Sequence, residues 1–190
     1  MQNRFAASML GLSLLWVASL AHTALAEPVT IDAVHSSMLF RVKHMNTSYI
    51  WGRFNDFSGA LNLDGPSPSV NVLIKTDSID TGNGKREQHL KSPDFFNARQ
   101  FSTITFKSTK VQPAGDGKYK VDGKLTLHGV EKPITLELVR TGANKGPQGT
   151  PIVGYETTFK IKRSEFGMTF SLEGASDEVL LVANLECGGK

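Results

Sequence analysis

Apolar and polar residues alternate along most of the chain after Glu27, and Gly, Pro, Asn and Asp interrupt the alternation at short intervals. A period of two residues is typical of half-buried antiparallel strands. The alternating stretches cover residues 36–44, 52–63, 70–76, 104–108, 118–128, 134–139, 155–161 and 179–185. The pattern predicts about eight strands, with tight turns at Asp116-Gly117 and His128-Gly129.

Several stretches depart from this alternation. The register of the apolar positions slips at Asn55-Asp56, which predicts a β-bulge of the kind that bends barrel strands. Residues 84–98 begin with good helix formers and predict one short helix or lid, and residues 164–176 leave room for a second helical turn. Residues 141–151 are rich in Gly and Pro and predict a flexible loop.

These elements leave two all-β architectures open, a sandwich and a closed barrel. Eight antiparallel strands of this length can close on themselves and leave no exposed edge. We therefore expect a single eight-stranded antiparallel barrel with one or two short helices and no domain linker or internal repeat. A barrel of this size either fills with side chains or holds one small elongated ligand.

Composition narrows the classes of function. The chain of 190 residues has a formal net charge of +3, but its basic residues form no cluster, which argues against a nucleic-acid partner. Its single cysteine, Cys187, excludes an internal disulfide and a multi-cysteine zinc site. A lone thiol so near the C-terminus is more often incidental than catalytic, and pairing with another molecule in an oxidising compartment stays open.

The N-terminal segment has the pattern of a secretory signal peptide. Arg4 precedes an apolar run over residues 6–21, and a small-residue cleavage site ends at Ala26. The run is shorter than the roughly 20 residues that span a bilayer, which favours a cleaved signal over a retained anchor. We expect a signal peptide over residues 1–26, cleaved after Ala26, and a secreted domain over residues 27–190 without a membrane span.

A series of short motifs resembles one family of proteins over residues 29–186. The motifs, in chain order, are His35-Ser36-x-x-x-Phe40-x-Val42-x-His44, Gly52-x-Phe54-x-x-Phe57-x-Gly59, Ser78-Ile79-x-Thr81, Arg86-x-x-His89-Leu90-x-Ser92-x-Asp94-Phe95-Phe96, Ile104-Thr105-Phe106-x-Ser108-Thr109, Gly123-x-Leu125-Thr126-x-His128-Gly129-Val130-x-Lys132-Pro133, Arg163-Ser164-x-Phe166-Gly167 and Asp177-Glu178-Val179. Their order resembles the YceI-like family of secreted bacterial proteins. One departure is Glu87, where the family more often has Asp.

The resemblance implies a lipocalin-like barrel in the periplasm that binds a polyisoprenoid lipid, such as a polyprenyl chain, a quinone or a polyprenyl phosphate. On this expectation, inward-facing apolar side chains form the lumen that holds the lipid. The candidates are Met38, Phe40, Val42, Phe54, Val72, Ile74, Phe106, Val121, Leu125, Leu136, Phe159 and Ile161. Small residues at other inward positions leave space for a tunnel: Ser36, Gly59, Thr76, Ser108, Gly123, Thr157 and Ala183.

Two polar segments are candidates for the mouth of such a lumen. Arg86 and His89 share one face of a helical turn. The candidates for binding a lipid head group are Arg86, His89, Phe95, Phe96, Arg163 and Phe166. The alternative interpretation is structural: a solvated helix with local Arg–carboxylate pairs, and a salt bridge from Arg163 to Asp177 or Glu178.

The chain contains no recognisable catalytic motif. It has no G-x-S-x-G and no phosphate-binding loop, and its histidines at 35, 44, 89 and 128 lack HxH or HxxxH spacing. We expect no enzyme activity, metal site or cofactor. Two other functions remain open, a secreted hydrolase that uses His35 or His89 and a stress-response protein that binds an envelope partner through its outer face. The oligomeric state is open, and a dimer is one alternative.

Overall fold

The computed structural model describes residues 28–188, so the predicted signal peptide and its cleavage after Ala26 lie outside the described residues. The strands are β1 (Val29–His44), β2 (Ser48–Phe54), β3 (Phe57–Asn62), β4 (Ser69–Lys75), β5 (Ile79–Asp80), β6 (Thr103–Pro113), β7 (Lys118–Leu127), β8 (Val130–Lys145), β9 (Pro151–Lys162) and β10 (Ala175–Gly188). The helices are η1 (Thr76–Ser78), α1 (Gly84–Leu90) and η2 (Arg163–Phe166). Within residues 28–188, no helix is long and apolar enough to cross a membrane.

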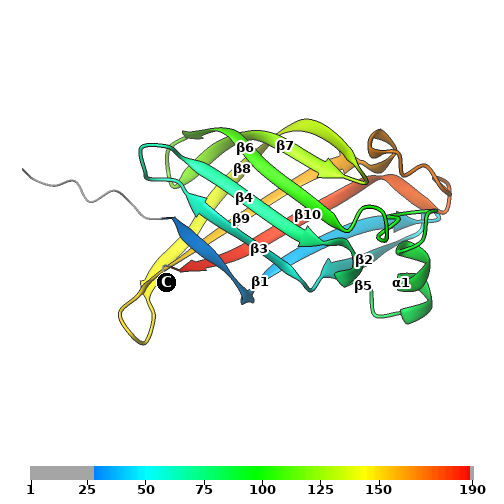
Figure 1. Ribbon diagram of the computed structural model, residues 1–190, viewed down its shortest axis with the longest axis horizontal. Coiled ribbons are helices and arrows are strands. Elements are labelled where there is room, and N and C mark those ends of the chain that lie inside the picture. The colour runs from blue at the N-terminus through cyan, green and yellow to red at the C-terminus, as the bar shows by residue number, and fades with distance from the viewer. Residues whose placement is uncertain (1–27, 189–190) are drawn as a thin grey trace, which may run out of the picture.

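The strands form one antiparallel sheet that closes on itself. Neighbours in the sheet follow chain order from β3 to β10, and β10 then pairs with β1 (Figure 1). β2 and β3 lie one after the other against β1, and β5 and β4 lie against β2 and β3 in turn. Each of these two pairs is one strand with a break, so the ring contains eight strands, which confirms the predicted eight-stranded barrel.

A break between β2 and β3 lies at Asn55-Asp56, where the sequence predicts a bulge. Phe54 and Phe57 are both buried although they are three residues apart. Even-numbered positions therefore face the interior before the break, and odd-numbered positions face it after the break. The backbone N–H of Asn55 donates to Ser78 O (3.1 Å), and Asp56 O accepts from Lys75 N (2.9 Å). The interruption therefore spans both neighbouring strands and lies beside η1.

The turns follow the residues that favour a positive φ. His128 and Gly129 have φ values of 51° and 75° and connect β7 to β8 as a two-residue turn. Asp116 and Gly117 adopt 49° and 73° before β7. Both predicted turns are confirmed.

One sequence-based expectation was wrong in extent. The flexible loop expected over residues 141–151 is mostly strand, because β8 continues to Lys145 and its last residues pair with β9. Cross-strand hydrogen bonds therefore override the local preference of Gly and Asn for a loop.

The short helix expected between residues 84 and 98 is confirmed. It is α1, and turns follow it as far as residue 100.

Buried side chains fill the end of the barrel where β10 ends at Gly188, and we call it the closed end. Figure 1 shows this end opposite α1. Tyr119 and Tyr155 pack there with ring centroids 6.4 Å apart, and the hydroxyl of Tyr119 donates to Asp64 (3.1 Å). Cys187 is fully buried between β1 and β9, which argues against its pairing with another molecule. Burial raises its pKa to about 11, which leaves no reactive thiolate near neutral pH.

Candidate functional site

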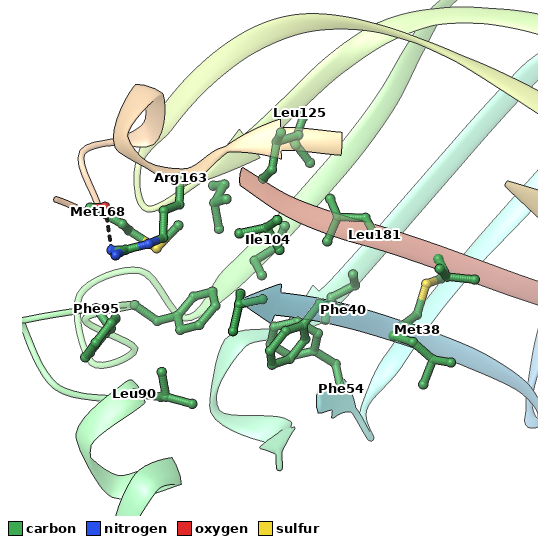
Figure 2. Close-up of a pocket in the computed structure, with 18 of the residues that line it drawn as sticks. Met38, Phe40, Phe54, Leu90, Phe95, Ile104, Leu125, Arg163, Met168 and Leu181 are labelled. Atoms are coloured by element: carbon green, nitrogen blue, oxygen red, sulfur yellow. Dashed lines mark hydrogen bonds between the residues drawn. The ribbon is translucent and has the colours of Figure 1, made fainter. Parts of the chain in front are cut away.

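The other half of the barrel contains a cavity of about 450 Å³. This volume lies within the roughly 300–1,000 Å³ range of ligand pockets. Its wall is almost entirely apolar and comes from most strands of the barrel, together with α1 and the segments that follow α1 and η2. Figure 2 shows Phe40 and Phe54 beside each other on the wall, with Leu125, Ile104 and Leu181 across the space from them.

Most of the predicted lumen residues line this cavity. The eleven that do so are Met38, Phe40, Val42, Phe54, Val72, Ile74, Phe106, Leu125, Leu136, Phe159 and Ile161. Val121 does not, and this is a correction. The strand alternation correctly predicts that its side chain faces the interior. That side chain is fully buried among others near the closed end, beside Val111 and Leu136.

The small inward residues leave less space than the sequence suggests. A Cβ at Gly123 would overlap the ring of Phe106, and one at Gly59 would overlap Ile31 and the backbone of β4. Neighbouring side chains therefore occupy the room that these glycines provide. Among the seven small candidates, only Thr157 and Ala183 line the cavity.

Several wall residues were not among the candidates. Ile104, Leu127, Leu138, Val179, Leu181 and Leu185 lie on alternating strand positions, so parity alone could have found them. Met168 and Phe170 belong to the irregular segment after η2 and carry no periodic signal. Leu90 lies on α1, and Figure 2 shows its side chain directed from the helix toward the cavity.

Three segments surround the end of the cavity nearest α1, and we call this end the mouth. They are the β1–β2 turn with Met45, residues 86–96 of α1 and the segment after it, and the loop 167–174 between η2 and β10. Met45 N donates to Gly174 O (2.9 Å). His89 and Phe95 both pack against Phe170, with ring centroids 5.5 and 5.4 Å apart. The three segments therefore support one another around the mouth.

Arg163 holds the loop 167–174 in place. Its guanidinium donates five hydrogen bonds of 2.7–3.1 Å, all to backbone carbonyl oxygens, namely those of Met168, Phe170, Ser171, Ala175 and Ser176. One of these bonds is drawn in Figure 2. Every N–H of the guanidinium is thus in use. Arg163 lines the cavity, but its geometry is that of a residue that positions the mouth and does not leave a free donor for a head group.

The salt bridge considered for Arg163 is absent from residues 28–188, where no carboxylate lies within 4.0 Å of its guanidinium. Asp177 instead accepts hydrogen bonds from the backbone N–H and the hydroxyl of Ser164, both 2.8 Å. The backbone bond is the main reason why the pKa of Asp177 is lowered. Burial lowers the pKa of Arg163, and the charge of Asp177 partly opposes that effect.

Arg86 is the more available cation at the mouth. Its Nε donates to Thr81 Oγ1 (2.9 Å) and its Nη2 to Thr81 O (2.7 Å). In the described part of the chain, Nη1 makes no hydrogen bond, and Arg86 has no ion pair with a carboxylate. Glu87 accepts from the backbone N–H groups of Thr81 and Asn83 instead, so the predicted local Arg–carboxylate pair does not form.

His89 lies beside Arg86 on the cavity wall, as expected for residues on one helical face. Its Nε2 lies 2.9 Å from Asp94 Oδ2, and its ring packs edge-on against Phe95 at 5.0 Å. Phe95 and Phe96 also line the cavity. Phe166 does not, which is a second correction. It is 1% exposed and packs into the core below η2, with its carbonyl 3.1 Å from Nδ1 of His128.

Titratable groups outside the mouth form one further cluster. Single ligand atoms of Asp32, His35 and Glu186 lie within 4.8 Å of one another on the outside of the barrel. Asp32 accepts from Nδ1 of His35 (2.9 Å) and from the backbone N–H of Val34 (2.8 Å), which stabilises a bulge in β1. The hydrogen bond to Asp32 raises the pKa of His35, and the same bond lowers that of Asp32.

Among the residues that the structure describes, no histidine ring lies in hydrogen-bond contact with a candidate nucleophile. The hydroxyl of Ser36 donates to Glu186 O (3.3 Å) and accepts from Glu186 N (2.9 Å), so it does not reach the neighbouring His35. No Ser, Thr or Cys side chain in this part of the chain bonds to a histidine. The arrangement suits the binding of an apolar molecule with a polar end at the mouth.

Comparisons with known proteins agree with this architecture. A model of the YceI-like domain matches residues 29–187. A UPF0312 protein of Yersinia pestis (strain Pestoides F) is 41% identical over 184 residues, which cover 94% of this chain and 95% of that protein. The crystal structure of the Campylobacter jejuni YceI protein is 30% identical, with a TM-score of 0.71 and coverage of 94% of this chain and 99% of that one.

A more distant structure shares the fold. It is described as a polyisoprenoid binding domain from Saccharophagus degradans, implicated in plant cell wall breakdown. Its sequence is 19% identical, its TM-score is 0.68, and the match covers 88% of this chain and all of that one. At this identity the likeness shows the barrel architecture and no more.

Proposed function

Because this chain belongs to the YceI-like family, we propose that it is a periplasmic carrier or store for one isoprenoid lipid and does not catalyse a reaction. The observation that carries the proposal is the apolar cavity, which is open at the mouth and filled at the closed end. The lipid tail would lie along the barrel axis, and its polar end would remain at the mouth.

The energetics of burial support a hydrocarbon ligand. Each CH₂ group removed from water contributes roughly 0.8 kcal/mol, so a tail of about 15 carbons contributes on the order of 12 kcal/mol before costs. Ordering and association costs remove a large part of this free energy. Micromolar binding requires only about 8 kcal/mol, so an apolar cavity of this kind provides enough without any polar anchor.

The mouth supports a head group that accepts hydrogen bonds, such as a phosphate or a quinone carbonyl. Arg86 has an amino group that is free of intramolecular bonds, and His89 lies next to it on the wall. Arginine is suited to phosphate because it can donate two parallel hydrogen bonds. The polyisoprenoid binding of the Saccharophagus domain is a property of that protein, and it makes the isoprenoid class the first to test here.

In residues 28–188 no Ser, Thr or Cys side chain bonds to a histidine ring, which favours binding over hydrolysis by a histidine-activated nucleophile. The predicted signal peptide over residues 1–26 supports export to the periplasm. Cell fractionation, followed by mass measurement of the exported chain, tests both the location and cleavage after Ala26.

The central experiment combines extraction with a variant that fills the cavity. Lipid extracted from the purified protein is identified by mass spectrometry, and delipidated protein is titrated with geranylgeranyl phosphate and geranylgeraniol. Ala183 lines the cavity beside Thr157, its pairing partner on β9, so Ala183→Phe should lower the affinity for both probes by at least about tenfold. The matched control is Ala143→Phe, on the exposed end of β8, which should bind like the parent.

Two results would count against the proposal. Protein from its native host that carries no lipid and binds neither probe does not have this function. If Ala183→Phe binds as tightly as the parent while remaining folded, the lipid lies elsewhere. The affinity of the parent for geranylgeranyl phosphate is also compared with its affinity for geranylgeraniol. If the phosphate binds more tightly, and Arg86→Gln abolishes this difference while Arg99→Gln keeps it, the head-group contact belongs to Arg86.

A further inference from the structure

The exposed apolar side chains of this protein gather at one end. Among residues 28–188, the large hydrophobic side chains that are exposed are Val34, Met45, Tyr49, Trp51, Phe170 and Leu172. All but Val34 belong to the β1–β2 hairpin or to the loop 167–174, which are the two segments joined by the bond from Met45 N to Gly174 O. Exposed apolar residues that gather in one place usually mark a binding surface. We call these five residues the rim.

The rim is continuous with the cavity. Met45 is 63% exposed and Phe170 is 44% exposed, yet both also line the cavity wall. Phe170 packs against His89 and Phe95 at the mouth. Figure 1 shows the loop 167–174, the β1–β2 turn and α1 at the same end of the barrel. Met45 and Phe170 therefore connect the exposed rim to the apolar wall of the lumen.

Positive charge accompanies the aromatic part of the rim. Arg41 pairs with Trp51 and Lys43 pairs with Tyr49 across β1 and β2. The guanidinium of Arg41 lies 4.1 Å from the ring centroid of Tyr49 and 5.4 Å from that of Trp51. Within the described residues neither Arg41 nor Lys43 forms an ion pair with a carboxylate. Both charges are available to an outside partner.

We propose that the rim docks onto the surface of an anionic lipid bilayer, with the mouth turned toward the membrane. Trp and Tyr prefer the boundary between head groups and hydrocarbon, and unpaired Arg and Lys attract anionic head groups. A bilayer is favoured over a protein partner because the rim surrounds an opening, and only a hydrocarbon phase continues the apolar environment of the cavity. This inference rests on the proposed lipid cargo, which would then pass between membrane and lumen without crossing water.

The test is flotation with vesicles made of equal parts phosphatidylglycerol and phosphatidylethanolamine, or of phosphatidylcholine alone. The protein is produced from its complete gene and purified as the cell processes it, so all variants share one N-terminus. The parent should float with the anionic vesicles, should bind phosphatidylcholine more weakly, and should detach as salt is raised. Arg41→Gln should reduce the difference between the two vesicle types.

The decisive variant is Trp51→Ser combined with Leu172→Ser, because both side chains are exposed and neither lines the cavity. Bound protein should fall by about tenfold or more, while affinity for geranylgeraniol stays that of the parent. The matched control is Val34→Ser, which removes the most exposed apolar side chain, at 85%, away from the rim. It should float like the parent.

Different failures identify different errors. If the parent binds geranylgeraniol but does not float with anionic vesicles, or if the double variant floats like the parent, the docking proposal is wrong and the carrier proposal stands. If the parent does not float and forms a dimer in sedimentation that the double variant dissociates, the rim is an interface between two copies. If the parent floats and the double variant does not, but geranylgeraniol never binds, the rim docks and the lumen proposal is wrong.

Discussion

The two ends of the barrel are built from the same strands and differ in almost every other respect. At the closed end, Tyr119, Tyr155 and Cys187 fill the interior, and the hydroxyl of Tyr119 donates to Asp64. At the mouth, apolar side chains surround an open space, and Arg86, His89 and Arg163 on α1 and η2 contribute polar groups. The strand alternation runs through both ends, so it does not distinguish a filled interior from an open one.

The two ends also differ in whether their polar groups are accessible to a ligand. Burial raises the pKa of Tyr155 to about 12, so its phenol remains neutral and unreactive throughout the physiological range. At the mouth, Arg86 keeps unpaired donors and His89 is about half exposed. Of the two ends of the interior, only the mouth therefore offers polar groups that a ligand can reach.

Truncating Tyr155, one of the large side chains that fill the closed end, is expected to have the largest effect. Tyr155→Ala deletes a side chain that is 3% exposed, and loss of a large buried aromatic side chain costs about 3–5 kcal/mol of folding free energy. Urea unfolding measures this loss. Where the variant remains folded, the longer cavity should bind longer isoprenoids than the parent does. An unchanged preference for chain length would mean that the side chain of Tyr155 does not set the depth of the cavity.

Loosening the mouth is expected to have the next largest effect. Arg163→Met keeps an apolar stem but leaves five carbonyl groups without their donor, so the free energy of unfolding should fall by about 3 kcal/mol. Hydrogen exchange should rise in residues 167–175 and not at the closed end. Arg140→Met, at an exposed position, is the control and should change stability by less than about 0.5 kcal/mol.

A smaller effect of opposite sign is expected inside the cavity. Thr157 is 7% exposed, and its hydroxyl has no hydrogen-bond partner. Thr157→Val replaces this hydroxyl with a methyl group of similar size and should stabilise the protein by about 1 kcal/mol in urea unfolding. The control is Thr135→Val, which removes a hydroxyl bonded to Asp122 on the outside of the barrel and should not stabilise it. A destabilised Thr157→Val would indicate an ordered partner for the hydroxyl.

The smallest effect concerns the pH dependence of the exposed pair between Asp32 and His35. The folded-state pKa of His35 lies above its ordinary value of 6.5, so this contribution to stability is complete below pH 6.5 and is lost as pH rises through the raised pKa. The pKa of Asp32 is lowered from 3.8, so its contribution is lost only as pH falls below that value. NMR titration of His35 should show the raised pKa, and Asp32→Asn should return it toward 6.5.

Several features of the site were accessible from the sequence. Period-two parity identified eleven wall residues, including Phe40, Phe106 and Phe159, because a strand directs alternate side chains to opposite faces. The helical spacing of Arg86 and His89 correctly placed both on the cavity side. Val121 was misassigned because parity indicates which face a side chain occupies, and not whether the space beside it is empty.

Other features depended on contacts between distant segments. Arg163 was grouped with the head-group residues, yet its donors are all used by carbonyl groups up to thirteen residues away. Phe166 was placed at the mouth, and η2 buries it in the core. The rim combines β1, β2 and the loop 167–174, and no local pattern indicates that these segments meet.

Local periodicity and backbone preferences are enough to predict that this chain forms antiparallel strands, where its principal turns lie and which side chains face inward. They do not predict that one end of the barrel is filled and the other is open, because that difference arises from packing between distant segments. The depth of a cavity depends on how side chains from strands far apart in the chain share one interior. Phe106 over Gly123 and Tyr119 beside Tyr155 are packing outcomes of that kind, and no single strand specifies them.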